Sequence, residues 1–85
     1  MEKTTFTREY DLLRRMLREL RERQGVTQVE LAERLKETQS YVSKCERGER
    51  RLDLVQVRAF CAALKIPLVE FVGDFERRLG SRGKR

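Results

Sequence analysis

The stretch that decides the fold runs from Thr27 to Gly48 and reads TQVELAERLKETQSYVSKCERG. Thr27 and Glu30 have the spacing of a capping box, in which each side chain bonds the backbone N–H of the other at the start of a helix. A short helix is therefore predicted at about residues 28–35. Its apolar face consists of Leu31, Ala32 and Leu35.

A second short helix follows after an interruption of the apolar pattern at Lys36-Glu37. Thr38 is its candidate N-cap, the helix is predicted at about 39–46, and Val42 and Cys45 are its expected buried pair. The opposite side carries four polar side chains: Gln39, Ser40, Ser43 and Lys44. Such groups can bond base edges in the DNA major groove, where donor and acceptor patterns distinguish all four base pairs. Two short helices joined in this way are typical of a helix-turn-helix, whose second helix lies in that groove.

The segment resembles the helix-turn-helix of the Xre and lambda-repressor/Cro-like family. The residues that carry the resemblance are Gln28, Leu31-Ala32, Leu35, Thr38-Gln39-Ser40, Val42-Ser43-Lys44 and Glu46-Arg47-Gly48, with Leu17, Leu20 and Arg21 before them and Leu54–Val57 and Leu64 after them. The resemblance covers roughly residues 12–70 and implies an all-α, five-helix DNA-binding domain. The sequence departs from the family at Lys36-Glu37, where members often carry Gly and a small apolar residue.

The resemblance also implies roles for side chains beside the predicted 39–46 helix, which is called the reading helix because it would enter the DNA groove. It places Arg21 opposite Glu46, as a partly buried ion pair that holds the first helix to the end of the reading helix. It implies that Gln28 contacts a phosphate and braces Gln39. The alternative for Gln28 is an exposed residue at the start of a helix, with no further role.

Further phosphate contacts are expected at helix starts and in the loop after the reading helix, since helix N-termini and arginines attract phosphate oxygens. The full set of predicted phosphate contacts is Thr27, Gln28, Thr38, Tyr41, Arg47, Arg50 and Arg51. Basic loops are common, so a solvated turn is the alternative for the three arginines.

The composition favours a polyanionic partner. The chain has 85 residues, which suits one domain, and 20 Lys+Arg against 14 Asp+Glu give a net charge of +6. Such a surface favours double-stranded DNA first and an anionic membrane second. No apolar run approaches the ~18 residues of a membrane span, and nothing resembles a signal peptide. We therefore expect a cytoplasmic protein with no membrane partner.

No enzyme, cofactor or metal site is expected. The chain has no histidine, no glycine-rich phosphate loop and no carboxylate pair in a plausible cleft. Its two cysteines, Cys45 and Cys61, occupy apolar positions and lack CxxC spacing, so a zinc site would have too few ligands. They are interpreted as buried, reduced thiols, with a redox switch through Cys45 as the alternative.

The remaining chain is predicted to complete a helix-turn-helix domain over 7–79. Residues 1–6 are interpreted as a flexible arm and 80–85 as a flexible basic tail. Further helices are predicted at about 8–24, 54–64 and 67–79, the first capped by Thr7 and the second by Asp53. The expected apolar set of the 54–64 helix is Leu54, Val57, Phe60, Cys61 and Leu64.

The last helix has a wider apolar stripe than a small core needs. Leu68 and Phe71 are expected to close the core, whereas Val72, Phe75 and Leu79 are expected to form an exposed patch that serves as a dimer interface. These features predict a sequence-specific transcriptional regulator, a repressor that acts as a homodimer on a pseudo-palindromic operator. The alternative is a protein-interaction module with an unknown partner, such as the antitoxin of a toxin–antitoxin pair or a transcription adaptor.

Overall fold

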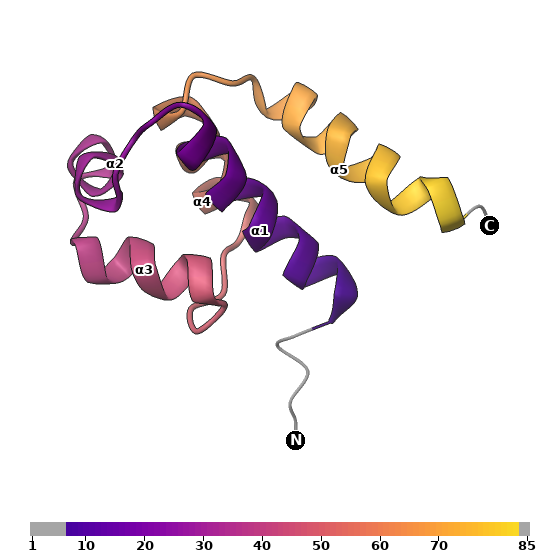
Figure 1. Cartoon of the computed structure of the whole chain (residues 1–85), viewed down its shortest axis with the longest axis horizontal. Helices are drawn as coiled ribbons and strands as arrows, with labels where there is room; N and C mark the ends of the chain where they lie inside the picture. The colour runs from indigo at the N-terminus through magenta and orange to yellow at the C-terminus, as the bar shows by residue number, and fades with distance from the viewer. Residues whose placement is uncertain (1–6, 84–85) are drawn as a thin grey trace.

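Five helices make up the computed structural model, which describes the backbone of residues 7–83 and the side chains of residues 7–80. The helices are α1 (Arg8–Arg23), α2 (Gln28–Leu35), α3 (Gln39–Arg47), α4 (Leu54–Ala63) and α5 (Leu68–Gly83). The described residues contain no strand, so the predicted all-α, five-helix fold is confirmed. In Figure 1, α2 and α3 lie together on one side, α1 crosses the middle in front of α4, and α5 runs along the opposite side.

Side-chain caps begin the first four helices. Thr7, Thr27, Thr38 and Asp53 each accept a hydrogen bond from the backbone N–H three residues later. Thr27 and Asp53 form complete capping boxes with Glu30 and Gln56, in which the reciprocal bonds are both 2.8 Å long. Caps of this kind typically contribute about 1 kcal/mol each. The predicted helix starts therefore agree with the observed ones to within one residue.

The end of α5 corrects a prediction. The helix continues through Gly83, four residues beyond the predicted end at Leu79, so residues 80–83 belong to α5 and not to a tail. Glycine lowers helix propensity by about 1 kcal/mol but does not break a helix as proline does, and no proline follows Leu79. The predicted arm at 1–6 and the last two residues of the predicted tail lie outside the described residues.

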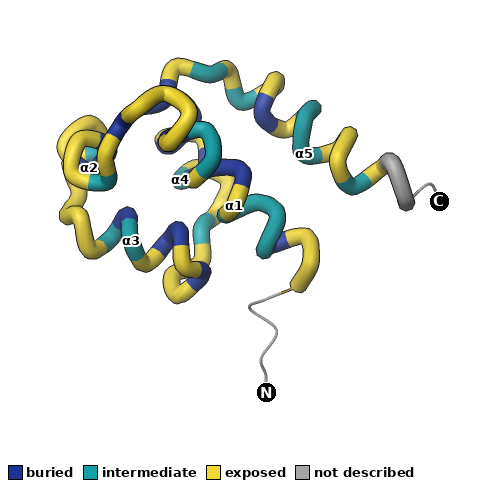
Figure 2. Tube along the Cα trace, in the orientation of Figure 1, coloured by how far each residue is buried: buried dark blue, intermediate teal, exposed yellow. Residues whose placement is uncertain are grey.

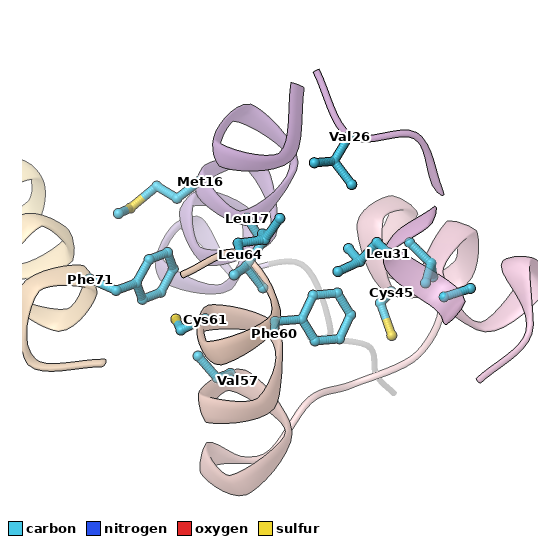
Figure 3. Close-up of a cluster of buried hydrophobic side chains, with 12 residues drawn as sticks. Met16, Leu17, Val26, Leu31, Cys45, Val57, Phe60, Cys61, Leu64 and Phe71 are labelled. Atoms are coloured by element: carbon cyan, nitrogen blue, oxygen red, sulfur yellow. The ribbon is translucent and has the colours of Figure 1, made fainter. Parts of the chain in front are cut away.

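The core is a single cluster to which all five helices contribute. Leu31, Val42, Phe60 and Leu64 are at most 1% exposed. Figure 3 shows Phe60 extending from α4 toward Leu31 and Cys45, while Phe71 extends from α5 toward Met16 and Cys61. Through these side chains, the five helices pack against one another.

Both cysteines are buried and free, as predicted. Burial raises the pKa of the Cys61 thiol to about 11 and also raises the pKa of Cys45. Both thiols are therefore neutral at physiological pH and pack as small apolar side chains.

Leu54 does not join the core. It was predicted in the apolar set of the fourth helix, but it is 66% exposed. It is the first helical residue of α4, where the chain has only begun to turn toward the core. Leu52, two residues earlier in the loop, packs against the core instead.

Candidate nucleic-acid interface

The outer side of α3 is polar and open. Gln39, Ser40 and Lys44 are exposed and Ser43 is half-buried, whereas Val42, Cys45 and Glu46 are buried on the opposite side. At about 100° per residue, the four polar positions and Arg47 fall within an arc of about 140°. Figure 2 shows the buried positions of α3 turned toward the rest of the molecule and the exposed positions turned away. All four predicted base-contact residues therefore lie on one accessible face.

The turn between α2 and α3 has a left-handed residue. Lys36 has φ 60° and ψ 42°, and its backbone N–H bonds the carbonyls of Ala32 and Glu33. The N–H of Glu37 then bonds the Ala32 carbonyl at 2.9 Å, and Thr38 caps α3. This conformation suits glycine best, since a side chain is disfavoured there. The turn is nevertheless closed by these hydrogen bonds and by the cap of α3.

A buried ion pair fixes α3 to α1. The Arg21 guanidinium donates to both carboxylate oxygens of Glu46, with Nε–Oε2 2.6 Å and Nη2–Oε1 2.9 Å, and its third nitrogen donates to the Val26 carbonyl at 2.9 Å. Arg21 is 8% and Glu46 is 5% exposed. The hydrogen bond to Glu46 raises the pKa of Arg21, so Arg21 stays charged. The pair implied by the resemblance is thus present in the structure.

Two glutamine amides extend this pair to the surface of α3. Gln28 Nε2 donates to Glu46 Oε1 at 2.9 Å, and Gln39 Nε2 donates to Gln28 Oε1 at 2.8 Å. A carboxylate only accepts hydrogen bonds, so Gln28 must turn its NH₂ group to Glu46 and its oxygen to Gln39. Gln39 must then use one N–H for Gln28, which leaves its Oε1 and second N–H available at the exposed end of α3.

Three arginines lie at the end of α3 and in the loop that follows it, in different settings. Arg47 pairs with Glu49 at 2.9 Å and donates to Ser43 Oγ. The hydrogen bond to Glu49 raises the pKa of Arg47, and the hydrogen bond to Arg47 lowers the pKa of Glu49. The guanidinium carbon of Arg50 lies 5.0 Å from the ring centre of Tyr41, and that of Arg51 lies 4.7 Å from the ring centre of Tyr10.

Tyr41 has a partly internal role. Its ring centre is 6.3 Å from that of Phe60, and its hydroxyl accepts a hydrogen bond from Gln56 Nε2 at 3.3 Å. Burial raises the pKa of Tyr41. The side chain therefore joins α3 to α4, in addition to bordering the predicted interface.

Sequence reasoning missed two residues that support this face. The Tyr10 hydroxyl donates to the Arg50 carbonyl at 3.2 Å and accepts from the Leu52 N–H at 3.0 Å. Arg14 Nη1 donates to the Glu46 carbonyl at 2.9 Å, near the end of α3. Their only sequence signal is spacing, because Tyr10 precedes Leu13 and Leu17 on the apolar side of α1 and Arg14 follows Tyr10 by one turn.

The predicted dimer residues differ in exposure. Val72 is 39% exposed, whereas Phe75 and Leu79 are half-buried and Phe75 packs against the core. Beside Val72, a hollow of about 340 Å³ opens between α1, α4 and α5. Its apolar lining includes Leu13, Leu52, Leu54, Val57, Phe71 and Phe75. The exposed apolar surface on this side thus consists chiefly of Val72 and Leu54.

The described residues offer few other kinds of site. No group of three or more His, Cys, Asp or Glu side chains in this part of the chain is arranged to hold a metal ion. No helix within it is long and apolar enough to cross a membrane.

Comparison with known proteins agrees with the geometry. A family model described as a helix-turn-helix domain matches residues 12–71. The structure is similar to that of an XRE-family like protein from Pseudomonas syringae pv. tomato str. DC3000, with 38% sequence identity, a TM-score of 0.78, and coverage of 82% of this chain and 85% of that one. It is also similar to the clp gene regulator ClgR from Corynebacterium glutamicum, with 28% identity, a TM-score of 0.67, and coverage of 88% and 84%. The comparison with curated proteins gave no match.

Proposed function

This chain belongs to the Xre-like helix-turn-helix family of DNA-binding transcription regulators, and from that premise we propose that it is a repressor that binds a pseudo-palindromic operator as a homodimer. The proposal rests chiefly on the open polar face of α3. That face is fixed to the core through Gln39, Gln28 and the buried Glu46. The side chain of Gln39, the first residue of the reading helix, is therefore already oriented before DNA binds.

Gln39 is proposed to read adenine. Its free Oε1 and remaining N–H are the acceptor and donor that adenine N6 and N7 require. Lys44 is exposed about one and a half turns further along the same face and suits guanine O6 or N7. Ser40 and Ser43 are the other proposed base contacts, although Ser43 also receives a hydrogen bond from Arg47.

Contacts to the phosphate backbone of the DNA are proposed to hold the register of α3 in the groove. Phosphate contacts position a protein on the duplex without reading sequence. The proposed contacts are Thr27 and Gln28 at the start of α2, Thr38 and Tyr41 at the start of α3, Arg47 at its end, and Arg50 and Arg51 in the loop after it. The net charge of +6 strengthens attraction to DNA of any sequence.

A homodimer is proposed because one reading helix contacts too few base pairs to specify a site. In helix-turn-helix dimers, two half-sites lie about 34 Å apart on one side of the duplex. The apolar surface beside Val72 and Leu54 is the proposed interface. A dimer bound over a promoter excludes polymerase by occupancy alone, which is the reason for favouring repression.

Selection of bound duplexes from a random pool, followed by affinity measurements, tests this function. We expect a two-fold symmetric preferred site with adenine in each half. Gln39→Ala and Lys44→Ala should each weaken binding to that site by roughly 1–3 kcal/mol and relax the preference at one position, because each removes a base contact.

Arg58→Ala is the matched control for Lys44→Ala, since it removes one positive charge from an exposed side chain of α4, a helix that carries none of the proposed DNA contacts. It should leave the sequence preference unchanged. Selection that returns no preferred site at low salt, or variants of Gln39 and Lys44 that bind the site as tightly as the original chain, would contradict the proposal.

A further inference from the structure

The two arginines in the loop after α3, Arg50 and Arg51, contact aromatic rings, whereas Arg47 at the end of α3 contacts a carboxylate. Arg47 is paired with Glu49. Within the described part of the chain, the side chains of Arg50 and Arg51 form no ion pair or hydrogen bond, and each lies over a tyrosine ring instead. No carboxylate in that part of the chain therefore neutralises their charges, although both side chains have a fixed neighbour.

The ring beneath Arg50 is held against α4. Tyr41 packs against Phe60 and its hydroxyl is bonded to Gln56, so its ring cannot swing away without breaking both contacts. On α3, position 41 lies about 60° around the helix from position 44. The ring therefore holds Arg50 at the edge of the face that carries Lys44.

The ring beneath Arg51 is held by α1. Tyr10 is 8% exposed, and its hydroxyl bonds the backbone of the loop at Arg50 and Leu52. One turn further along α1, Arg14 bonds the carbonyl of Glu46. These contacts fasten the loop backbone to α1, so Arg51 starts from a fixed position.

We propose that Tyr10 and Tyr41 are positioning residues for DNA binding, which hold Arg51 and Arg50 ready for two phosphates beside the reading helix. A guanidinium stacked over a ring can still direct N–H groups outward, where they can donate two parallel bonds to a phosphate. A long side chain held beforehand also loses less rotamer entropy when it binds. This inference rests on the proposed function.

The test uses a substitution that leaves the net charge unchanged. Tyr41→Leu removes the ring but keeps Arg50, and should weaken binding about 2–5-fold to the selected site and to an unrelated duplex alike, which matches the strength of an exposed cation–π contact. Tyr41→Phe keeps the ring and should lose less. Arg50→Lys keeps the charge without the planar group and should weaken binding to a similar extent as Tyr41→Leu.

A double-mutant cycle separates positioning from folding. In an Arg50→Ala background, Tyr41→Leu should weaken binding less than it does when Arg50 is present, because only the proposed phosphate contact of Tyr41 itself is then lost, and the salt dependence of the two chains should coincide. An equal loss with and without Arg50 would show that the ring acts through the fold, and would overturn the inference. Unchanged affinity in both Tyr41→Leu and Arg50→Lys would also overturn it. Either result leaves the proposed function intact as long as the original chain selects a preferred site, whereas the absence of any preferred site refutes the function itself.

Discussion

At the scale of single residues, Lys36 has a left-handed backbone conformation that disfavours a side chain. A side chain in this conformation costs roughly 1 kcal/mol relative to glycine. Hydrogen bonds of the neighbouring residues hold the turn in this conformation, because the Glu37 N–H bonds the Ala32 carbonyl and Thr38 caps α3. Lys65, with φ 63°, also has a left-handed conformation, two residues after the end of α4.

Lys36→Gly is expected to stabilise the fold by about 0.5–1 kcal/mol, because glycine adopts this conformation without strain. For a domain of this size, that corresponds to a rise in melting temperature of roughly 2–8 °C. Thermal denaturation followed by circular dichroism measures the change.

Glu33→Gly is the control, since it places glycine at an exposed position inside α2. It should destabilise the fold by roughly 0.5–1 kcal/mol. Destabilisation by both substitutions would mean that residue 36 does not have a positive φ in solution.

At the scale of elements, the contacts around Glu46 hold three helices together. Arg21 on α1 and Gln28 on α2 both bond the carboxylate of Glu46 on α3. A buried charge that loses its partner costs more than the pair contributes when complete, because the remaining charge stays out of water. The orientation of α3 therefore depends on every member being present.

Arg21→Ala should destabilise the protein by about 3–5 kcal/mol, since it leaves Glu46 buried without its counter-ion. Arg18→Ala is matched to it, because Arg18 is on the same helix and pairs with Glu22 at 3.0 Å, but both of those side chains are exposed. It should change stability by less than about 1 kcal/mol. Guanidinium unfolding of the two variants gives the comparison, and equal effects would show that the Arg21 pair is not buried in solution.

Features that depend on local spacing were predictable, whereas those that depend on how helices meet were not. The caps at Thr27 and Asp53 and the polar face of α3 follow from residues within one or two turns. The exposure of Leu54 and the contacts of Tyr10 do not, because they depend on where α4 and the loop lie relative to α1. The Arg21–Glu46 pair came from the family resemblance, since nothing in the spacing brings residues 25 positions apart together.

At the scale of the whole molecule, the reading face and the apolar hollow involve different helices. The polar face is on α3, while the hollow lies between α1, α4 and α5. A second copy bound at Val72 and Leu54 would leave the polar face of α3 uncovered. Phe75, one of the three residues predicted for the interface, packs against the core, so its replacement would disturb folding as well as association.

Leu54→Asp and Val72→Asp are expected to weaken dimerisation by on the order of 10-fold or more, because each places a charge in an apolar contact. Val55→Asp is the control, since Val55 is 75% exposed on the same helix as Leu54 but lines a different hollow. Sedimentation equilibrium measures the masses.

Dimers that survive both substitutions would place the interface elsewhere. A chain that remains monomeric even on its selected DNA would contradict the homodimer, and would favour the alternative in which this surface binds another protein.

The hydrogen-bonded link from Glu46 through Gln28 to Gln39 also bears on how a new operator preference would evolve. Replacing Gln39 alone leaves Gln28 Oε1 without its donor, so a change of base at that position calls for a compensating change at Gln28. The side chains of Ser40 and Lys44 have no hydrogen-bonded partner among residues 7–80 and can vary singly. Divergence among paralogues of this protein should therefore be rapid at 40 and 44, and should couple 28 with 39.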